Sequence, residues 1–119
     1  MVQKSTILIP ADNSGALTVN VFHIYGGGKK KTAYPGNFTK VSVRSLDMNP
    51  KVKKKSKFIS ILIRSKYRYL KKDGTCIYSD SNNCILLKKR LTPVGKEIYG
   101  PVYKIIRRKK FISSFPGIL

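Results

Sequence analysis

The chain has 119 residues and carries 25 lysines and arginines against 5 aspartates and glutamates, a formal net charge of +20. We expect residues 1–119 to form a single domain, which is too small to hold a large enzyme cleft. This excess of positive charge goes far beyond what solubility requires and indicates a polyanionic partner. Nucleic acid is the first candidate, and an anionic membrane is the second.

Membrane insertion is disfavoured by the distribution of apolar and basic residues. No apolar run approaches the roughly 18 to 20 residues of a membrane-spanning helix. The basic residues are spread over the whole chain instead of lining one long helix. The start, MVQKSTILIPADNSG, has neither the apolar region of a signal peptide nor an Arg/Ser-rich transit segment. We expect a protein made where it works, or one whose presequence is missing from this sequence.

A series of short strands is predicted from residue 6 onwards. Valines such as Val19 and Val21 alternate with polar residues, which is typical of a strand with one buried face. The stretch from Phe58 to Ile63 is almost continuously apolar, as expected for a strand buried on both sides. Strands at this spacing predict a small closed barrel. The expected strands are residues 6–9, 17–25, 38–46, 57–65 and 82–87.

Three glycines run directly into three lysines at residues 26–31. A nucleotide-binding loop would need Gly-x-x-x-x-Gly-Lys followed by Ser or Thr. The position five before Gly28 is His23, and Lys30 follows Lys29, so this pattern fails on both sides. No Gly-x-Gly-x-x-Gly pattern of a dinucleotide site is present either. We therefore predict a turn with positive φ at the glycines, followed by solvated lysines.

A β-hairpin is predicted at residues 66–80, where an Asp-Gly pair lies between two alternating arms. In the first arm Tyr67 and Tyr69 would lie on one face. Lys66 and Arg68 would lie on the other face, where they can pair with phosphates. The tyrosines can stack on bases or pack internally. A merely solvated hairpin is the simpler alternative, but the net charge favours contact with RNA.

Two further basic segments follow different patterns. Residues 50–57, PKVKKKSK, hold 5 lysines in eight positions, and this run is long enough to enter an RNA groove and become ordered there. Near the end of the chain, Pro101 suits the first position of a helix. Val102, Ile105 and Ile106 recur at helical spacing and are followed by basic residues, so a short helix is predicted there.

Catalytic and metal sites are not expected. Two cysteines and one histidine do not provide the four ligands of a zinc site. A disulfide between Cys76 and Cys84 is allowed by count but is not implied, and both are expected to be buried or half-buried on or near strands. Four of the five carboxylates sit beside turn residues, where aspartate commonly caps the backbone. His23 lies within a predicted strand and is interpreted as a structural or RNA-facing residue. The sequence thus predicts neither an enzyme nor a cofactor.

Several stretches, taken in chain order, match one known family: VQKST, ADNSGA, GGGKKK, VSV, KVKKK, the block ILIR…DG…N…IL, and PVGKEIYGPV. With these stretches the chain resembles the universal large-subunit ribosomal protein L-fourteen, in its bacterial and organellar form. The match is collinear and covers nearly the whole chain, and ADNSGA and IYGPV are its most specific pieces.

Four positions and the length of the tail depart from the pattern of that family. Ser60 stands where Gly or Ala is preferred, and Ser79 stands where Phe or Tyr is expected, which affects packing near the hairpin base. The tail after Phe111 is shorter than usual. Lys104 and Lys109 replace residues that are commonly acidic.

The resemblance implies a mostly β fold, a small closed five-stranded β-barrel with a projecting β-hairpin and short C-terminal helices. It implies a structural role in the large ribosomal subunit, direct contact with large-subunit rRNA, and an intersubunit bridge that touches small-subunit rRNA. Implied neighbours are ribosomal proteins similar to L-three and L-nineteen. A ribosome silencing factor is a weaker candidate, because Lys96-Glu97 replaces the Thr-Arg commonly seen there.

The expected location is a ribosome in the mitochondrial matrix, with a bacterial-type cytoplasm as the alternative. One glutamate and many Lys, Ile, Asn, Tyr and Ser residues are typical of an AT-rich organellar gene. Two other functions stay open: a free-standing RNA-binding regulatory barrel, and a cationic membrane-active protein. Sedimentation with ribosomal subunits would separate the first from a ribosomal protein, and vesicle binding would test the second.

The candidate contacts are basic residues of these loops and strands. Predicted rRNA contacts are Lys29, Lys30, Lys31, Lys40, Arg44, Lys51, Lys53, Lys54, Lys55, Arg64, Lys66, Arg68, Lys71 and Lys72. Predicted bridge contacts are Lys96, Lys104, Arg107 and Arg108.

Overall fold

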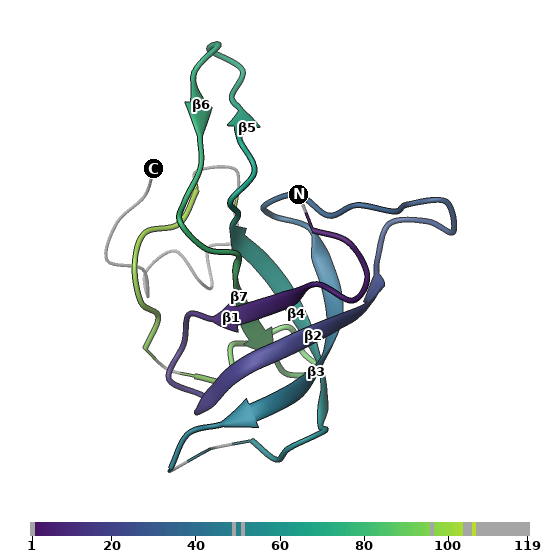
Figure 1. The fold of residues 1–119 in the computed structure, drawn as a ribbon, viewed down its shortest axis with the longest axis vertical. Helices are drawn as coiled ribbons and strands as arrows, with labels where there is room; N and C mark the ends of the chain where they lie inside the picture. The colour runs from purple at the N-terminus through teal and green to yellow at the C-terminus, as the bar shows by residue number, and fades with distance from the viewer. Residues whose placement is uncertain (1, 49, 51, 96, 104–105, 107–119) are drawn as a thin grey trace.

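The computed structural model describes residues 2–48, 50, 52–95, 97–103 and 106. Five strands close into a barrel (Figure 1). In order around the barrel they are β1 (Ile7–Pro10), β2 (Ala16–Ile24), β3 (Phe38–Leu46), β4 (Lys57–Arg64) and β7 (Asn83–Leu87). Neighbouring strands are antiparallel, except that β7 closes the barrel by pairing in parallel with β1. The predicted mostly β fold and its five-stranded closed barrel are confirmed.

The two remaining strands, β5 (Tyr69–Leu70) and β6 (Cys76–Ile77), form a hairpin that projects from the barrel between β4 and β7 (Figure 1). The predicted hairpin is therefore confirmed, with Gly74 at φ 90° in its turn. Its paired arms are shorter than expected, because Lys66 and Tyr67 lie in a bend outside the ladder.

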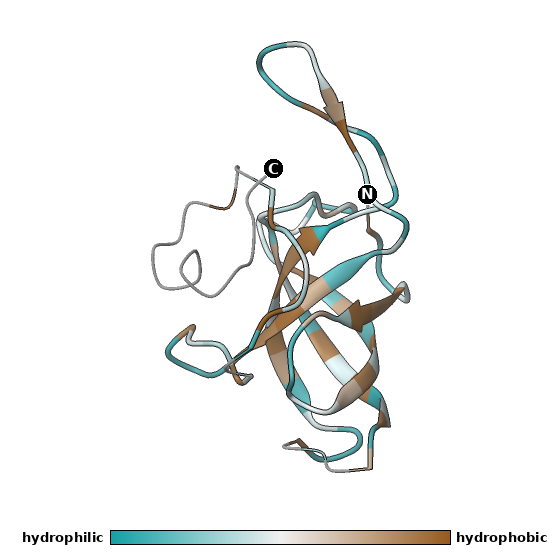
Figure 2. Cartoon of the chain, turned by 90° about the vertical axis from the view of Figure 1, so that its left-hand side faces the viewer, coloured by the Kyte–Doolittle hydropathy of each residue, from teal (hydrophilic) through white to brown (hydrophobic). Residues whose placement is uncertain are grey.

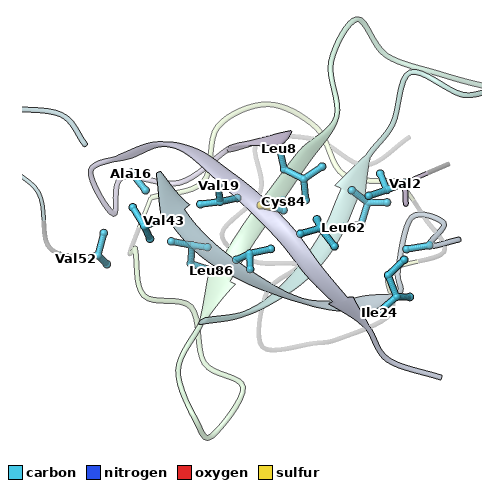
Figure 3. Close-up of a cluster of buried hydrophobic side chains, with 13 residues drawn as sticks. Val2, Leu8, Ala16, Val19, Ile24, Val43, Val52, Leu62, Cys84 and Leu86 are labelled. Carbon is cyan, nitrogen blue, oxygen red and sulfur yellow. The ribbon is translucent and has the colours of Figure 1, made fainter. Parts of the chain in front are cut away.

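The barrel interior is filled by every second side chain of the strands, as the period of a pleated strand requires. Figure 3 shows this cluster, with Val2 near one end of the barrel and Val52 at the other. A polar pair lies among the apolar side chains: the hydroxyls of Thr39 and Ser60 are hydrogen-bonded at 2.6 Å. The serine that departs from the family pattern at position 60 thus has its hydrogen bond satisfied inside the barrel. The labelled members of the cluster are Val2, Leu8, Ala16, Val19, Ile24, Val43, Val52, Leu62, Cys84 and Leu86.

A second apolar cluster buries the outer face of β4 and β7. Residues of the segment after β7, including Ile98 and Val102, pack there against Ile61 and Ile85. Because one face of β4 lines the interior and the other meets this segment, its sequence is apolar at successive positions. The prediction that residues 58–63 form a strand buried on both sides is confirmed, and the reason is the segment that covers it.

The C-terminal prediction falls largely outside the described residues. Pro101, Val102 and Tyr103 are described and are not helical. Most of the predicted helix, including Ile105, lies outside the described residues. The short C-terminal helices implied by the family resemblance fall there as well. Within the described part of the chain, no residue lies in a helix long and apolar enough to cross a membrane.

The two cysteines differ in burial. Cys84 is buried inside the barrel, as expected, whereas Cys76 is exposed. The expectation that both are buried or half-buried is therefore wrong for Cys76. The reason is its place on a hairpin that projects away from the barrel wall (Figure 1).

Candidate nucleic-acid interface

The strand order gathers the basic loops at the two ends of the barrel. The loop of residues 25–37 joins β2 to β3 and lies at the same end as the β5–β6 hairpin, which we call the hairpin end (Figure 1). Residues 47–56 and 88–92 follow β3 and β7 at the opposite end, because these strands run antiparallel to β4. The 8 residues of β4 rise about 3.3 Å each, so the two ends are about 25 Å apart.

At the hairpin end, two glycines turn the chain before the lysine run. Gly26 and Gly27 have φ values of 122° and 115°, so the predicted positive φ is confirmed for these two glycines but not for Gly28. The amide of Lys30 donates to the carbonyl of Gly27 at 3.2 Å, which closes the turn. A Cβ on Gly26 would lie 2.8 Å from Cδ of Lys30, so the lysine side chain lies directly along the glycine. Lys29 and Lys31 are exposed and Lys30 is half-buried.

The hairpin presents a second set of cations at the same end. Lys66, Arg68 and Lys72 are exposed, and Lys71 is half-buried. The guanidinium carbon of Arg68 lies 5.6 Å from the centre of the Tyr78 ring. This cation–π contact holds the arginine over an aromatic face and leaves its N–H groups available.

The predicted division of the first hairpin arm into a basic face and a tyrosine face is only partly formed. Tyr67 is 55% exposed, whereas Tyr69 is half-buried and pairs with Ile77 across the ladder. At the tip, the carboxylate of Asp73 accepts hydrogen bonds from the hydroxyl and the amide of Thr75 at 2.7 and 3.1 Å. These bonds lower the pKa of Asp73, and the ionised carboxylate therefore stabilises the turn of the hairpin.

At the opposite end, an apolar side chain anchors the lysine loop. Val52 is buried in the interior cluster, which fixes the exposed Lys53, Lys54 and Lys55 at the rim. The amide of Lys55 donates to the carbonyl of Val43 at 2.9 Å. Figure 2 shows this end from another side, with hydrophilic loops against the more apolar strands.

A hollow of about 290 Å³ opens at this end of the barrel, and its walls are Ser42, Val43, Arg44, Lys54 and Lys55. Its three cationic side chains can contact RNA phosphates.

A basic turn at this end was not predicted. Residues 88–91 form a tight turn in which Lys88 donates to the carbonyl of Thr92 and Leu91 donates to the carbonyl of Lys88, both at 2.8 Å. Leu91 packs against the outer cluster, and the cations are exposed. Its signal in the sequence is three consecutive cations, Lys88-Lys89-Arg90, directly after an apolar strand.

Two other candidates lie in the barrel wall, and one has a structural role. Lys40 is half-buried on β3. The side chain of Arg64 donates to Asn83 Oδ1 at 3.1 Å, to the Tyr99 carbonyl at 3.0 Å and to the Pro101 carbonyl at 2.6 Å. Partial burial lowers the pKa of Arg64. Its guanidinium joins the barrel to the segment after β7, and its contact with RNA stays a prediction.

Among the described residues, hydrogen bonds to hydroxyl and backbone N–H groups occupy the carboxylates of Asp12 and Asp73. No salt bridge joins two of the described residues. The buried carboxylate of Asp12 accepts hydrogen bonds from the hydroxyl of Ser14 at 2.7 Å and from the amide of Leu86 at 3.2 Å. Aspartate here caps backbone, as predicted. The exposed positive charge is thus left for an external anion.

The sequence model of one protein family, described as ribosomal protein L14p/L23e, matches residues 1–115 of the chain. The chain belongs to the ribosomal protein L14p/L23e family. It is also similar to the large ribosomal subunit protein uL14m of Tetrahymena pyriformis, with 45% identity over 117 residues, which cover 98% of each chain. The resemblance read from the motifs is therefore confirmed.

Membership of the L14p/L23e family makes the chain a structural constituent of the large ribosomal subunit. Among the described residues, no group of three or more His, Cys, Asp or Glu could hold a metal ion. The segment that contains the stretch IYGPV is held to the barrel near Gly95. Asn13 and Glu97 exchange two hydrogen bonds of 3.2 Å, and a Cβ on Gly95 would lie 2.6 Å from Asn13 Oδ1.

Five candidate contacts lie outside the described residues: Lys51, Lys96, Lys104, Arg107 and Arg108.

Proposed function

We propose that this ribosomal protein binds large-subunit rRNA through the basic loops at both ends of its barrel. The observation that carries the proposal is the gathering of exposed, unneutralised cations at those ends, described above. At the hairpin end they come from the glycine–lysine turn and the hairpin. At the opposite end they come from the loop anchored by Val52 and from the turn at residues 88–91. Phosphate contacts from such loops provide affinity and position the protein without reading sequence.

The barrel supports this function as a rigid spacer. Because its interior is filled and its strands close on themselves, the two basic ends keep a separation of about 25 Å. One protein molecule can then bind two separate rRNA segments, or two parts of one segment, one at each end of the barrel. We propose that residues 1–119 act in this way as one L-fourteen-like domain.

The test is the salt dependence of binding to a transcript of the large-subunit rRNA. Replacing Lys53, Lys54 and Lys55 together with alanine removes three charges at one end. The slope of log K against log salt should then fall by about 2 to 3, because each lost phosphate contact releases one fewer counterion. The matched control replaces the same three lysines with arginine, which keeps the charge and should keep the slope. An alanine variant with the slope of the unchanged protein would contradict the proposal.

We propose the mitochondrial ribosome as the location of the protein. The similar protein of Tetrahymena pyriformis is designated uL14m, a name that fits this location. The amino-acid composition, which is typical of an AT-rich organellar gene, also supports a mitochondrial location. Mass spectrometry of gradient-purified mitochondrial large subunits would detect the chain if this is correct. Its presence only in slowly sedimenting fractions would favour the free-standing regulatory barrel instead.

We further propose that the stretch from Lys96 to Lys110 borders the subunit interface and touches small-subunit rRNA. The motif IYGPV motivates this placement, and the described residues Glu97 and Tyr99 beside Lys96 are exposed. The test is charge reversal at Lys96, Arg107 and Arg108. Large subunits should still assemble but should join small subunits less readily, most visibly at low magnesium. Failed assembly without a joining defect would mean that these cations neutralise large-subunit rRNA only.

Protein neighbours similar to L-three and L-nineteen are proposed for the apolar outer surface of β1 and β2. Ile7, Ile9 and Leu17 are 54%, 48% and 50% exposed there, and exposed apolar groups of this kind are typical of protein contacts. A ribosome silencing factor is a further proposed partner, at the face that carries Lys96. Crosslinking of intact large subunits, with mass spectrometry of the linked peptides, would identify the proteins at each surface.

A further inference from the structure

A β-bulge in β2 turns two consecutive side chains to the outside of the barrel. Val21 pairs with Val41, and His23 pairs with Lys40, so β2 advances two residues where β3 advances one. In a regular strand, neighbouring side chains point to opposite faces. The extra residue of a bulge breaks that alternation. As a result Phe22 and His23 are both exposed, whereas Val21 remains buried in the barrel.

The bulge creates a row of aromatic rings along β2. Phe22 is 38% exposed, and Tyr25, two residues beyond His23, is 36% exposed. The rings of His23 and Tyr25 meet edge to face, with centroids 4.9 Å apart and planes at 88°. This geometry holds the two rings against each other while both remain at the surface.

Two lysines lie beside this row, one on β3 and one on β4, both on the same side of β2. The ammonium of Lys57, on β4, lies 5.8 Å from the centre of the Phe22 ring. It reaches that ring across Ser42 of β3, which pairs with Lys57 in the ladder and is too short to block it. Lys40, on the adjacent strand β3, is the ladder partner of His23. The sequences of β2, β3 and β4 contain no aspartate or glutamate.

We propose that Phe22, His23 and Tyr25 form a stacking platform for an unpaired base of RNA, with Lys40 and Lys57 contacting the phosphates beside it. This inference deepens the proposed rRNA-binding function and rests on it. Aromatic rings bind bases of any sequence through their flat faces, and adjacent cations bind the backbone. A nucleotide has a flat base and an anionic phosphate, and it therefore fits a surface of aromatic rings and ammonium groups that carries no carboxylates.

The position of the platform connects the two basic ends. Tyr25 is the first residue of the loop at the hairpin end, and Lys57, the first residue of β4, directly follows the lysine loop of the opposite end. A single strand of RNA that crosses the barrel between these ends would pass over the outer face of β2 and β3. Its phosphates would meet cations at both ends, and an unpaired base would meet the rings between them.

The probe is a single-stranded oligoribonucleotide of about 12 nucleotides that carries a central 2-aminopurine, whose fluorescence falls when it stacks. The full chain should quench this fluorescence and should prefer the single strand to a paired duplex of the same sequence. Combining Phe22→Leu with His23→Leu should remove most of the quenching and weaken binding about tenfold or more. The salt slope should stay unchanged, because no phosphate contact is lost.

Two control variants separate stacking from folding. Phe22→Tyr keeps an aromatic ring and should keep the quenching, and Leu17→Ala changes another exposed side chain of β2 and should have no effect. If the double variant does not fold, ultraviolet crosslinking of the unchanged protein to the same probe decides. Crosslinks within residues 22–25 support the platform, and crosslinks confined to the lysine loops overturn it.

The outcome also separates this inference from the proposed function. If the double variant binds and quenches as the unchanged protein does, while alanines at Lys53, Lys54 and Lys55 weaken binding, the platform is wrong and rRNA binding by the ends stands. If neither set of changes weakens binding, both the platform and the proposed function are wrong.

Discussion

A guanidinium nitrogen of Arg64 donates a hydrogen bond of 2.6 Å to the carbonyl oxygen of Pro101, 37 residues further along the chain. This bond joins the end of β4 to the segment that covers the outer face of the barrel. Gly100 permits the approach, because a Cβ there would lie 2.6 Å from the same nitrogen. The arginine is therefore part of the fold, although its position in a basic sequence predicts an RNA contact.

The first prediction separates Arg64 from a cation of the same type that is exposed. Arg64→Ala should lower the free energy of unfolding by about 2 kcal/mol, because charge-assisted hydrogen bonds are lost and backbone carbonyls lose their partner. Arg44→Ala should change it by less than about 0.5 kcal/mol but should weaken RNA binding. Urea unfolding and RNA titration of both variants measure the two effects. Equal stability of the variants would show that the Arg64 bonds contribute little.

The second prediction concerns Lys55, whose backbone has a φ of 64°. A side chain in this left-handed conformation costs about 1 kcal/mol, which glycine avoids. Lys55→Gly should therefore raise the stability of the free protein by about this amount while weakening its binding to rRNA. Lys54→Gly is the control: it removes the same charge without relieving strain, so stability should not rise. Tighter RNA binding by Lys55→Gly would exclude a phosphate contact at this residue.

The third prediction concerns the face of β4 that meets the C-terminal segment. Ile61 is 2% exposed and belongs to the outer cluster with Ile98 and Val102. Ile61→Asp would bury an unpaired carboxylate and should cost several kcal/mol, a large part of the stability of a domain this size. The variant should fail to accumulate in large subunits.

Ile7→Asp is the control for this change, because Ile7 is 54% exposed. It introduces the same charge and should leave thermal unfolding of the free protein nearly unchanged. If Ile61→Asp is as stable as Ile7→Asp, the outer cluster does not contribute to holding the barrel together.

The fourth prediction concerns the buried thiol of Cys84. Burial, and then the charge of Asp12, raise the pKa of Cys84 far above its ordinary value of 9.0. Folding therefore stabilises the protonated thiol. This contribution is fully present below pH 9.0 and is lost as the pH rises above that value, by about 1.4 kcal/mol per pH unit.

Urea unfolding between about pH 8 and about pH 10.5 measures this dependence. Cys84→Ala serves as the reference, because lysines and tyrosines that titrate in the same range are common to both proteins. The difference in stability between the two should shrink with increasing pH. A thiol reagent at neutral pH should modify the exposed Cys76 and should leave Cys84 unmodified until the protein unfolds. Rapid labelling of both cysteines in the folded protein would contradict the burial of Cys84.

Local patterns in the sequence were sufficient for the strands and turns. The alternation around Val19 and Val21 placed β2, and the Asp-Gly pair placed the hairpin turn, because strand period and turn geometry depend on neighbouring residues only. Net charge indicated an anionic partner in the same way, since it does not depend on the fold. The motifs ADNSGA and IYGPV identified the family before any contact was known.

The roles of single residues depended on the tertiary structure. Whether Arg64 faces solvent or binds the Pro101 carbonyl is decided by a contact between distant parts of the chain, and no local pattern encodes it. The same holds for the outer cluster around Ile61, which exists because the C-terminal segment returns to β4. The exposure of both Phe22 and His23 depends on one extra residue in the register of β2 against β3. Composition and period therefore determine the barrel and its charge, whereas register and long-range packing decide which side chains remain free to bind RNA.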